Sequence, residues 1–321
     1  MAVIEAEATS AVVDREPLLS PVSIKNVLFA TDFSPISESA LPYATAICRR
    51  FGATLHTAHV LSDASLLMMT GGVDYVSMGT IFEDAQNEAN EKLEQLAPAC
   101  EGIPHRNYIR HGQVWKNLAA IVENNDINLI VVGTHGRSGL GRLLLGSVAE
   151  DILRHASCPV LTVGPKVSGR AKLPDFRSHG RDLAPVEIDL RQIVLATNFA
   201  KSSEQIARVA TRVANEFGAR LTLMHVIEDY TRLGKHSEPI EESTAKLRKL
   251  IPEEAGLHHV PEIVMEFGHA PERILKIAAD READMIILGA RSADMVSTHL
   301  PWSVAPHVIA QAHCPVLTIR Q

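Results

Sequence analysis

The chain alternates short apolar runs with longer amphipathic stretches. Five apolar runs in its first half have the length of buried strands, and they lie at 25–30, 53–61, 107–111, 127–133 and 159–163. The stretches between them carry apolar residues at helical spacing and predict helices at 34–51, 78–98, 114–124 and 147–155. Strands that alternate with helices indicate an α/β fold with a parallel, doubly wound sheet.

Turn and cap residues mark the ends of these predicted elements. Ser34-Pro35 is a typical helix start, with serine as the cap and proline at the first helical position. Pro42 lies inside the first predicted helix and predicts a local kink. Ser147 and Glu150 have the spacing of a capping box, which marks the start of the last of these helices.

The whole pattern then occurs a second time. Ala-Thr-Asp-Phe at 30–33 corresponds to Ala-Thr-Asn-Phe at 196–199, and Cys-Pro-Val-Leu-Thr at 158–162 recurs unchanged at 314–318. Two tandem copies of one domain are therefore expected. The predicted bounds are 1–22 for a disordered N-terminal arm, 23–165 for the first domain, 166–188 for a flexible linker rich in Lys, Arg, Gly and Pro, and 189–321 for the second domain.

The last strand of each copy begins with Cys-Pro. Proline lacks the N–H that a central strand donates, so this strand should start at the edge of its sheet. An exposed edge favours pairing with another strand. We therefore expect the two copies to pack as a pseudo-dimer through Val160–Val163 and Val316–Ile319. A homodimer of two such chains is a further alternative.

Composition narrows the class of protein. The chain has 321 residues, 46% hydrophobic and 21% charged, and a net charge of −7, which argues against a general binder of nucleic acid or of acidic membranes. Its four cysteines form no CxxC pair, as expected for a reducing compartment without a metal cluster. The N-terminal stretch lacks the features of a secretory signal, and no apolar run approaches the ~20 residues of a membrane span. We expect a cytoplasmic protein.

One glycine-rich stretch carries the candidate chemistry. Residues 133–147 read GTHGRSGLGRLLLGS, between an apolar strand and a predicted helix. The N–H groups and the dipole at a helix N-terminus favour an anion, and glycines allow backbone to approach a ligand and permit positive φ. Glycine-rich loops also occur without ligands, so the glycines alone leave both interpretations open.

The spacing Gly133-x2-Gly136-x9-Gly146-Ser147 resembles the ATP-binding signature of the universal stress protein family. The resemblance implies two tandem open, doubly wound five-stranded parallel sheets, Rossmann-like, each with strand order 3-2-1-4-5. In that order strands one and four are neighbours, so Asp32 lies next to Gly133. A ligand binds beyond the carboxyl ends of the strands at this point, where the strand order reverses.

The resemblance also implies a role for each site residue. Asp32 would serve the ribose, although its alternative role is to cap the turn before Ser34. Val60 would offer backbone groups to the adenine edge, and Ser147 would either bind phosphate or cap its helix. The expected nucleotide-binding residues are Ala30, Thr31, Asp32, Val60, Gly133, His135, Gly136, Arg137, Gly146, Ser147 and Val148, and no catalytic or metal-ligating residue is expected.

The second copy departs from the signature. Asn198 replaces Asp32, Ser292 replaces Gly136, Trp302 replaces Gly146, and Pro306 replaces Glu150. A bulky ring stands where backbone would approach phosphate, and proline removes an N–H. We expect a degenerate copy rather than a second ATP site.

These observations favour a regulatory protein of the stress response that binds ATP, or ADP or AMP, together with Mg²⁺, and that acts on an unknown protein partner. The alternatives are a slow ATPase of the same fold and an interaction scaffold that binds no nucleotide. Enzymes on related folds usually carry a serine- or glycine-rich phosphate loop directly after the first strand, and Thr31-Asp32-Phe33-Ser34 lacks one. We therefore do not expect an enzyme.

Overall fold

The computed structural model describes residues 23–62, 75–134, 145–174, 186–228, 238–251, 255–290 and 304–320. The N-terminal arm expected at 1–22 lies outside these residues. In the first half the elements are β1 Asn26–Ala30, α1 Pro35–Glu38, α2 Leu41–Phe51, β2 Thr54–Leu61, α4 Tyr75–Leu96, η1 Ala97–Cys100, β3 His105–His111, α5 Val114–Asn124, β4 Leu129–Gly133, α6 Ser147–His155 and β5 Val160–Val163. The expected strands and helices are confirmed, with ends that differ by a few residues, except that the helix expected at 34–51 is two helices.

The second half repeats this order after the short helix η2 Gly169–Ala171. Its elements are β6 Gln192–Ala196, α7 Ser203–Phe217, β7 Arg220–Ile227, α8 Glu238–Lys249, β8 Glu262–Phe267, α9 Ala270–Asp280, β9 Met285–Ala290, α10 Val304–Gln311 and β10 Val316–Arg320. The repeated sequence pattern therefore corresponds to a repeated fold.

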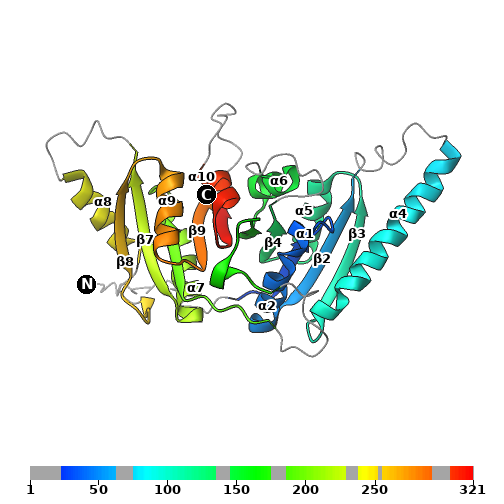
Figure 1. The fold of residues 1–321 in the computed structure, drawn as a ribbon, viewed down its shortest axis with the longest axis horizontal. Helices are drawn as coiled ribbons and strands as arrows, with labels where there is room; N and C mark the ends of the chain where they lie inside the picture. The colour runs from blue at the N-terminus through cyan, green and yellow to red at the C-terminus, as the bar shows by residue number, and fades with distance from the viewer. Residues whose placement is uncertain are drawn as a thin grey trace, which may run out of the picture.

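A single ten-stranded sheet runs through both halves (Figure 1). Its order is β3-β2-β1-β4-β5-β10-β9-β6-β7-β8, so each half has the expected order 3-2-1-4-5 and both halves meet at their fifth strands. Neighbouring strands are parallel within each half, and β5 pairs antiparallel with β10. The expected doubly wound sheets packed as a pseudo-dimer are confirmed, and they share one continuous sheet.

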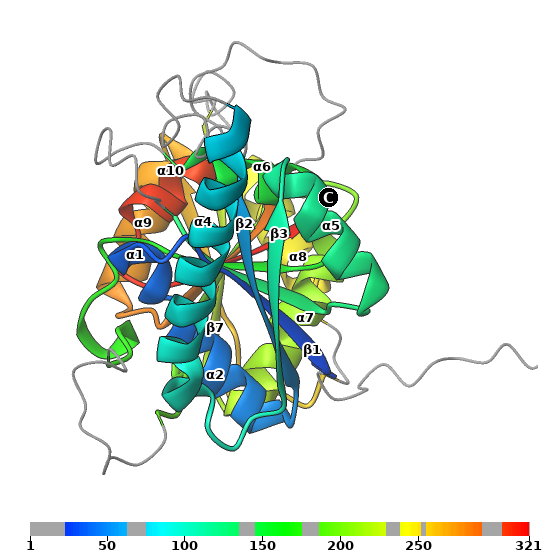
Figure 2. The ribbon, with the colours of Figure 1, turned by 90° about the vertical axis from the view of Figure 1, so that its right-hand side faces the viewer.

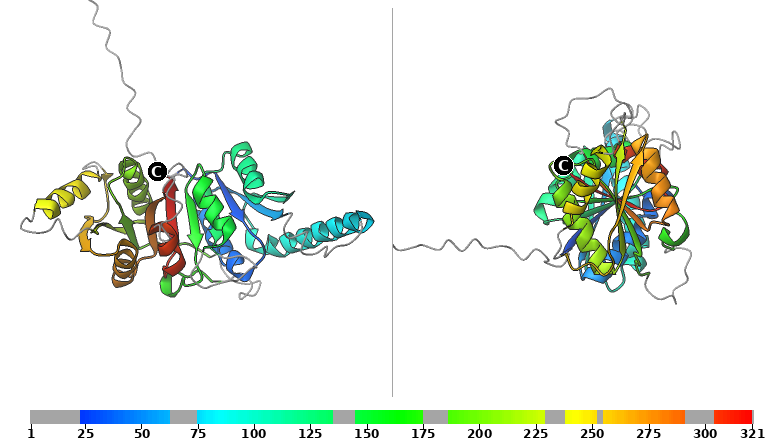
Figure 3. Two further views of the ribbon diagram at one scale, coloured as in Figure 1. Left: turned by 90° about the horizontal axis from the view of Figure 1, so that it is seen from above. Right: turned by 90° about the vertical axis from the view of Figure 1, so that its left-hand side faces the viewer.

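Helices cover both faces of this sheet, as the view from above shows (Figure 3). One face carries a hydrophobic cluster that spans both halves, with Phe29, Leu55 and Leu161 from the first and Leu195 and Leu223 from the second. The opposite face has one cluster under α5 and α6 and another under α9 and α10. Both faces of every central strand are therefore buried, which explains their uninterrupted apolar runs.

The junction of the halves is nearly symmetric. Val316 pairs with Thr162, and Thr318 pairs with Val160. The Thr162 hydroxyl donates to Val316 O at 3.0 Å, and the Thr318 hydroxyl donates to Val160 O at 3.2 Å. The predicted pairing of the fifth strands is confirmed.

A second contact between the halves lies at the ends of α2 and α7. The rings of Phe51 and Phe217 meet edge to face with centroids 6.4 Å apart. The Arg50 guanidinium lies 4.2 Å from the Phe217 ring and 3.3 Å from the Glu216 carboxylate. These contacts and the strand pairing fix the relative orientation of the two halves.

The first predicted helix is two helices. It breaks between α1 and α2, and Pro42 lies in the first turn of α2. The expected kink inside one helix is therefore wrong: proline is tolerated where a first-turn N–H has no intrahelical acceptor. Figure 2 shows α1 and α2 as separate helices.

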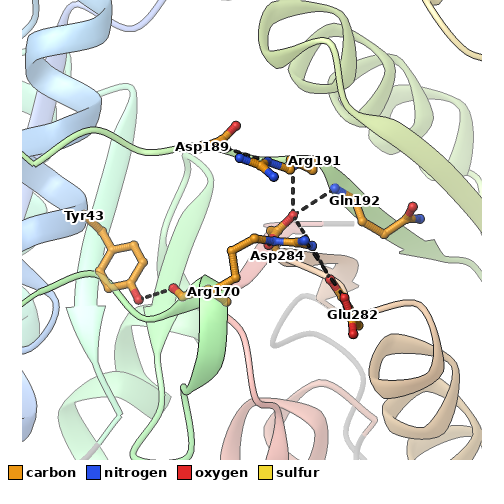
Figure 4. A network of polar contacts seen from close by, with 8 residues as sticks. Tyr43, Arg170, Asp189, Arg191, Gln192, Glu282 and Asp284 are labelled. Atoms are coloured by element: carbon orange, nitrogen blue, oxygen red, sulfur yellow. Dashed lines mark hydrogen bonds and ion pairs between the residues drawn. The ribbon is translucent and has the colours of Figure 1, made fainter.

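The first part of the linker connects the two halves (Figure 4). Tyr43 on α2 donates to Ala171 O at 2.6 Å and accepts from Leu173 N at 3.1 Å. Arg170 donates from Nε to the Asp284 carboxylate at 2.8 Å. Residues 166–173, which we call the strap, thus contact α2 of the first half and the start of β9 in the second. The sequence did not predict these contacts, and 175–185 lie outside the described residues.

The strap contacts a position that differs between the copies. Asp284 Oδ2 accepts the N–H groups of Arg191 and Gln192 at 2.8 and 2.9 Å. Asn128 in the first half accepts those of Lys25 and Asn26 with Oδ1 at 2.8 and 3.0 Å. An amide therefore suffices to cap the two strands. The Asp284 side chain is only 2% exposed, and its negative charge pairs with the Arg170 guanidinium.

We predict that Arg170→Ala lowers the free energy of unfolding by about 1–3 kcal/mol, because it leaves the Asp284 carboxylate buried without its partner. Asp284→Asn should retain the strand caps, as Asn128 does. In that background Arg170→Ala should cost much less. Urea unfolding of the four proteins measures the coupling. Equal losses in both backgrounds would show that the ion pair does not stabilise the fold.

Candidate functional site

The candidate site lies at the carboxyl ends of β1 and β4. These strands are neighbours, with Ala30 in register with Val132. The helices that follow them, α2 and α6, contact opposite faces of the sheet. This is the point where strand order reverses, and in open α/β sheets it is where ligands bind. The chain therefore brings the Thr31-Asp32 turn and the N-terminus of α6 to one edge.

A network of buried hydrogen bonds holds the turn after β1. The Thr31 and Ser37 hydroxyls lie 2.6 Å apart, and Phe33 N donates to Thr31 Oγ1 at 2.9 Å. Phe33 has a left-handed backbone with φ of 62°. His59 Nδ1 lies 2.8 Å from Thr31 O, so Nδ1 carries the proton. These contacts fix the direction in which Asp32 leaves the sheet.

Asp32 caps this turn. Its Oδ1 accepts the N–H of Ser34 at 3.0 Å, and its own N–H donates to Ser37 Oγ at 3.3 Å. The capping role that the sequence left as an alternative is thus observed. Any role of this half-buried carboxylate toward a ligand is additional to the cap.

Gly133 ends β4 where α1 crosses it. A Cβ at this position would lie 2.6 Å from Ile36 O and 2.7 Å from Ser37 Cα. Neither Gly133 nor Gly146 has a positive φ. Neither position therefore uses the positive φ that glycine permits, and Gly133 is required by the packing of α1 against β4.

Gly146 is the N-cap of α6, with φ of −64° and ψ of 146°. Its N–H donates to Thr134 O at 2.7 Å, so this amide is occupied and the expectation that it binds phosphate is not supported. Ser147 is the first helical residue and Glu150 pairs with Arg154 at 2.8 Å. The N–H of Glu150 donates to Gly146 O at 2.9 Å, so the predicted capping box is wrong. Among the described residues, the Ser147 hydroxyl has no cap hydrogen bond.

Ser147 and Val148 form the exposed start of α6. Val148 is 37% exposed, which is unusual for a large apolar side chain in this protein. First-turn N–H groups have no intrahelical acceptor and carry the positive end of the helix dipole. This end of the site can therefore bind an anion through the backbone.

The remaining expected residues fall into two groups. Ala30 is buried in β1, and Val60 lies in β2 beyond Ala58, the last residue in register with β1. His135, Gly136 and Arg137 lie outside the described residues. The described part of the chain thus brings together the β1 turn, the end of β2 and the start of α6.

The same turn is built in the second half. Thr197 Oγ1 donates to Ser203 Oγ at 2.8 Å, and His225 Nδ1 lies 2.8 Å from Thr197 O. Asn198 Oδ1 accepts from Ala200 N at 3.2 Å, as Asp32 does from Ser34. Sequence reasoning missed the histidine and serine that support each turn. The signal was present, because His59 and Ser37 recur 166 residues later as His225 and Ser203.

Other candidate chemistry is sparse in the described residues. They contain no group of three or more His, Cys, Asp or Glu side chains placed to hold a metal ion. The four cysteines are unbonded, and burial raises the pKa of the Cys48 thiol to about 12 and that of Cys100 to about 11, so both are poor nucleophiles. Among the described helices, none has the length and apolarity to cross a membrane.

Comparison with known proteins identifies the two halves. The family model described as "Universal stress protein family" matches residues 23–164 and again 190–320. The matches fall on the two five-stranded halves and cover most of the chain.

Individual relatives agree with the family model. The chain is similar to universal stress protein A homolog 1 of Coxiella burnetii, with 34% identity over 44% of this chain and 97% of that protein. A universal stress protein of Mycolicibacterium smegmatis is 25% identical over 92% of this chain and 96% of its own length. The crystal structure of a universal stress protein from Archaeoglobus fulgidus has a TM-score of 0.64 at 21% identity and covers 93% of this chain and 97% of its own. The last likeness concerns the fold.

We predict that Gly133→Ala destabilises the first half by about 2 kcal/mol or more, because the added Cβ would collide with the backbone of α1. Gly102→Ala is the matched control: its Cβ would meet nothing within 4 Å, and only its φ of +74° opposes alanine. The control should cost about 1 kcal/mol. Thermal and urea unfolding measure both. A smaller loss for Gly133→Ala than for Gly102→Ala would contradict the packing role.

Proposed function

This chain belongs to the universal stress protein family, and on that premise we propose that its first half binds one adenine nucleotide and that the protein is a nucleotide-dependent regulatory module. We propose 23–165 and 189–321 as the domain bounds, with 166–188 as the linker. We also propose that the protein is cytoplasmic and acts on a protein partner.

One observation carries the proposal. The Asp32 turn and the exposed N-terminus of α6 lie at the same edge, on the neighbouring strands β1 and β4. A carboxylate accepts hydrogen bonds from hydroxyls such as those of a ribose, and helix amides donate to phosphate. A ligand with a hydroxyl-bearing end and an anionic end fits this arrangement, as a nucleotide does.

We assign each end of the nucleotide to described residues. Asp32 would accept from the ribose, and the backbone near Val60 would face the adenine edge. The amides of Ser147 and Val148, with the Ser147 hydroxyl, would bind phosphate. We propose that Mg²⁺ binds together with the phosphates of ATP, because Mg²⁺ keeps several waters and is commonly held by substrate phosphates.

Sequence differences in the second half support a single nucleotide site per chain, in the first half. Asn198 lacks the charge of Asp32, and the bulky Trp302 replaces Gly146, which is the N-cap of α6 in the first half. We propose that this half binds no nucleotide. Isothermal titration with Mg²⁺ and ATP, followed by a phosphate-release assay, would test one-site binding and the alternatives of slow hydrolysis and of a ligand-free scaffold.

We predict that Asp32→Asn weakens ATP binding about tenfold, because the ribose loses a charged acceptor worth about 1.4 kcal/mol. The turn should survive, since Asn198 makes the same cap in the second half. Asn198→Ala is the matched control and should leave ATP affinity unchanged. Calorimetry measures each dissociation constant. An unchanged affinity in Asp32→Asn would remove Asp32 from the site.

We predict that Ser147→Ala weakens ATP binding by about 0.5–1.5 kcal/mol, the typical net contribution of one hydrogen bond. Because Ser147 is exposed and makes no cap hydrogen bond with the described residues, the free energy of unfolding should change by less than about 0.5 kcal/mol. A larger loss of stability with no loss of affinity would assign the hydroxyl to the helix.

A further inference from the structure

The start of α6 touches the second half of the protein. Leu145 directly precedes the Gly146 cap, and its side chain packs against the hydrophobic cluster of the second half. Leu153, two turns later on the same helix, packs against that cluster as well. The members of the cluster lie in β6, β7, β9, β10, α9 and α10 and in the turns beside them, so every buried member comes from the second half. In Figure 1, α6 and α10 stand on either side of the junction.

An independent backbone contact reaches the same point. A Cβ on Gly164 would lie 2.8 Å from Ile309 O, so the last turn of α10 lies directly against the backbone that follows β5. The preceding residue, Val163, accepts the N–H of Thr134 at 3.2 Å with its carbonyl. Thr134 O in turn accepts the N–H of Gly146 at 2.7 Å. Backbone contacts therefore connect α10 to the cap of α6.

We propose that the second half positions the N-terminus of α6 and that Leu145 is the positioning residue. The half that has lost the signature would thus set the affinity of the half that retains it. This inference rests on the proposed function, since it concerns how the phosphate end of that site is held. Leu145 would act through Gly146 and Ser147, without touching the nucleotide.

The physical reason is the directionality of amide hydrogen bonds. Amides at a helix start bind phosphate only when their N–H groups point at its oxygens, and binding geometry must be held within roughly 0.5 Å. Within the first half, α6 packs against α5 and β5. On the interface side, Leu145 packs against the second half, and the α10 backbone lies against Gly164, which follows β5.

The test compares three variants of the full chain. Leu145→Ala removes the contact with the second half, and Leu145→Met retains its apolar bulk. Phe217→Leu is the matched control, because it weakens the junction at its other end, where the Phe51 and Phe217 rings lie 6.4 Å apart. With ATP and Mg²⁺ in calorimetry, Leu145→Ala should bind about fivefold to tenfold more weakly, and the other two should bind as the unsubstituted protein does.

Hydrogen exchange gives a readout that requires no nucleotide. In the ligand-free protein, the Gly146 amide should exchange several-fold faster in Leu145→Ala and at its original rate in Phe217→Leu, even where both variants lose similar thermal stability. Unchanged exchange and affinity in Leu145→Ala would overturn the inference while the proposed function stands. Faster exchange in a chain that binds no ATP would support the positioning role and reject the proposed function. If Phe217→Leu changed ATP affinity and Gly146 exchange as much as Leu145→Ala does, the positioning role of Leu145 would be rejected in favour of a general effect on stability.

Discussion

The antiparallel pairing of β5 with β10 is the interaction on which the rest of the structure depends. A parallel sheet of five strands ends in an edge whose N–H and C=O groups lack partners. Here two such edges satisfy each other, and both threonines of the junction donate to carbonyls across it. Because the pairing is antiparallel, equivalent elements meet: the ends of α2 and α7 contact each other, and α6 lies beside the cluster under α10. The surroundings of the candidate site follow from this symmetry.

Comparison of the two halves shows which residues of the turn after the first strand the fold requires. Both halves hold the turn after their first strand with a threonine, a serine and a histidine at equivalent positions. Asp32 and Asn198 cap their turns with a side-chain oxygen in the same way. Since an amide oxygen makes this cap, the negative charge of Asp32 is not required by the turn. The cap therefore requires a side-chain oxygen at this position and not a charge.

Much of the fold could be predicted from the sequence, because buried parallel strands are apolar runs and the repeat supplies the pairing. Proline at the start of the fifth strand in both halves, together with the pairing that the family resemblance implies, predicted which strands meet. The details that the sequence did not predict depend on contacts between residues that are distant in sequence. The need for glycine at 133 comes from Ile36 and Ser37, and the occupied amide of Gly146 comes from Thr134. The strap contacts Tyr43 and Asp284, which lie more than a hundred residues from each end of it. No local pattern encodes such partners.

The two halves have become unequal at positions that the symmetric junction leaves unconstrained. The strap that follows β5 reaches the carboxylate of Asp284, while the amide of Asn128 stands at the equivalent position of the first half. The sequence signature persists in the first half only. The second half nevertheless retains its turn, its strand order and its packing against α6, because losing them would expose the edge of β5 and the apolar side chain of Leu145. A half without the complete signature is thus held in place by its structural contacts with the other half.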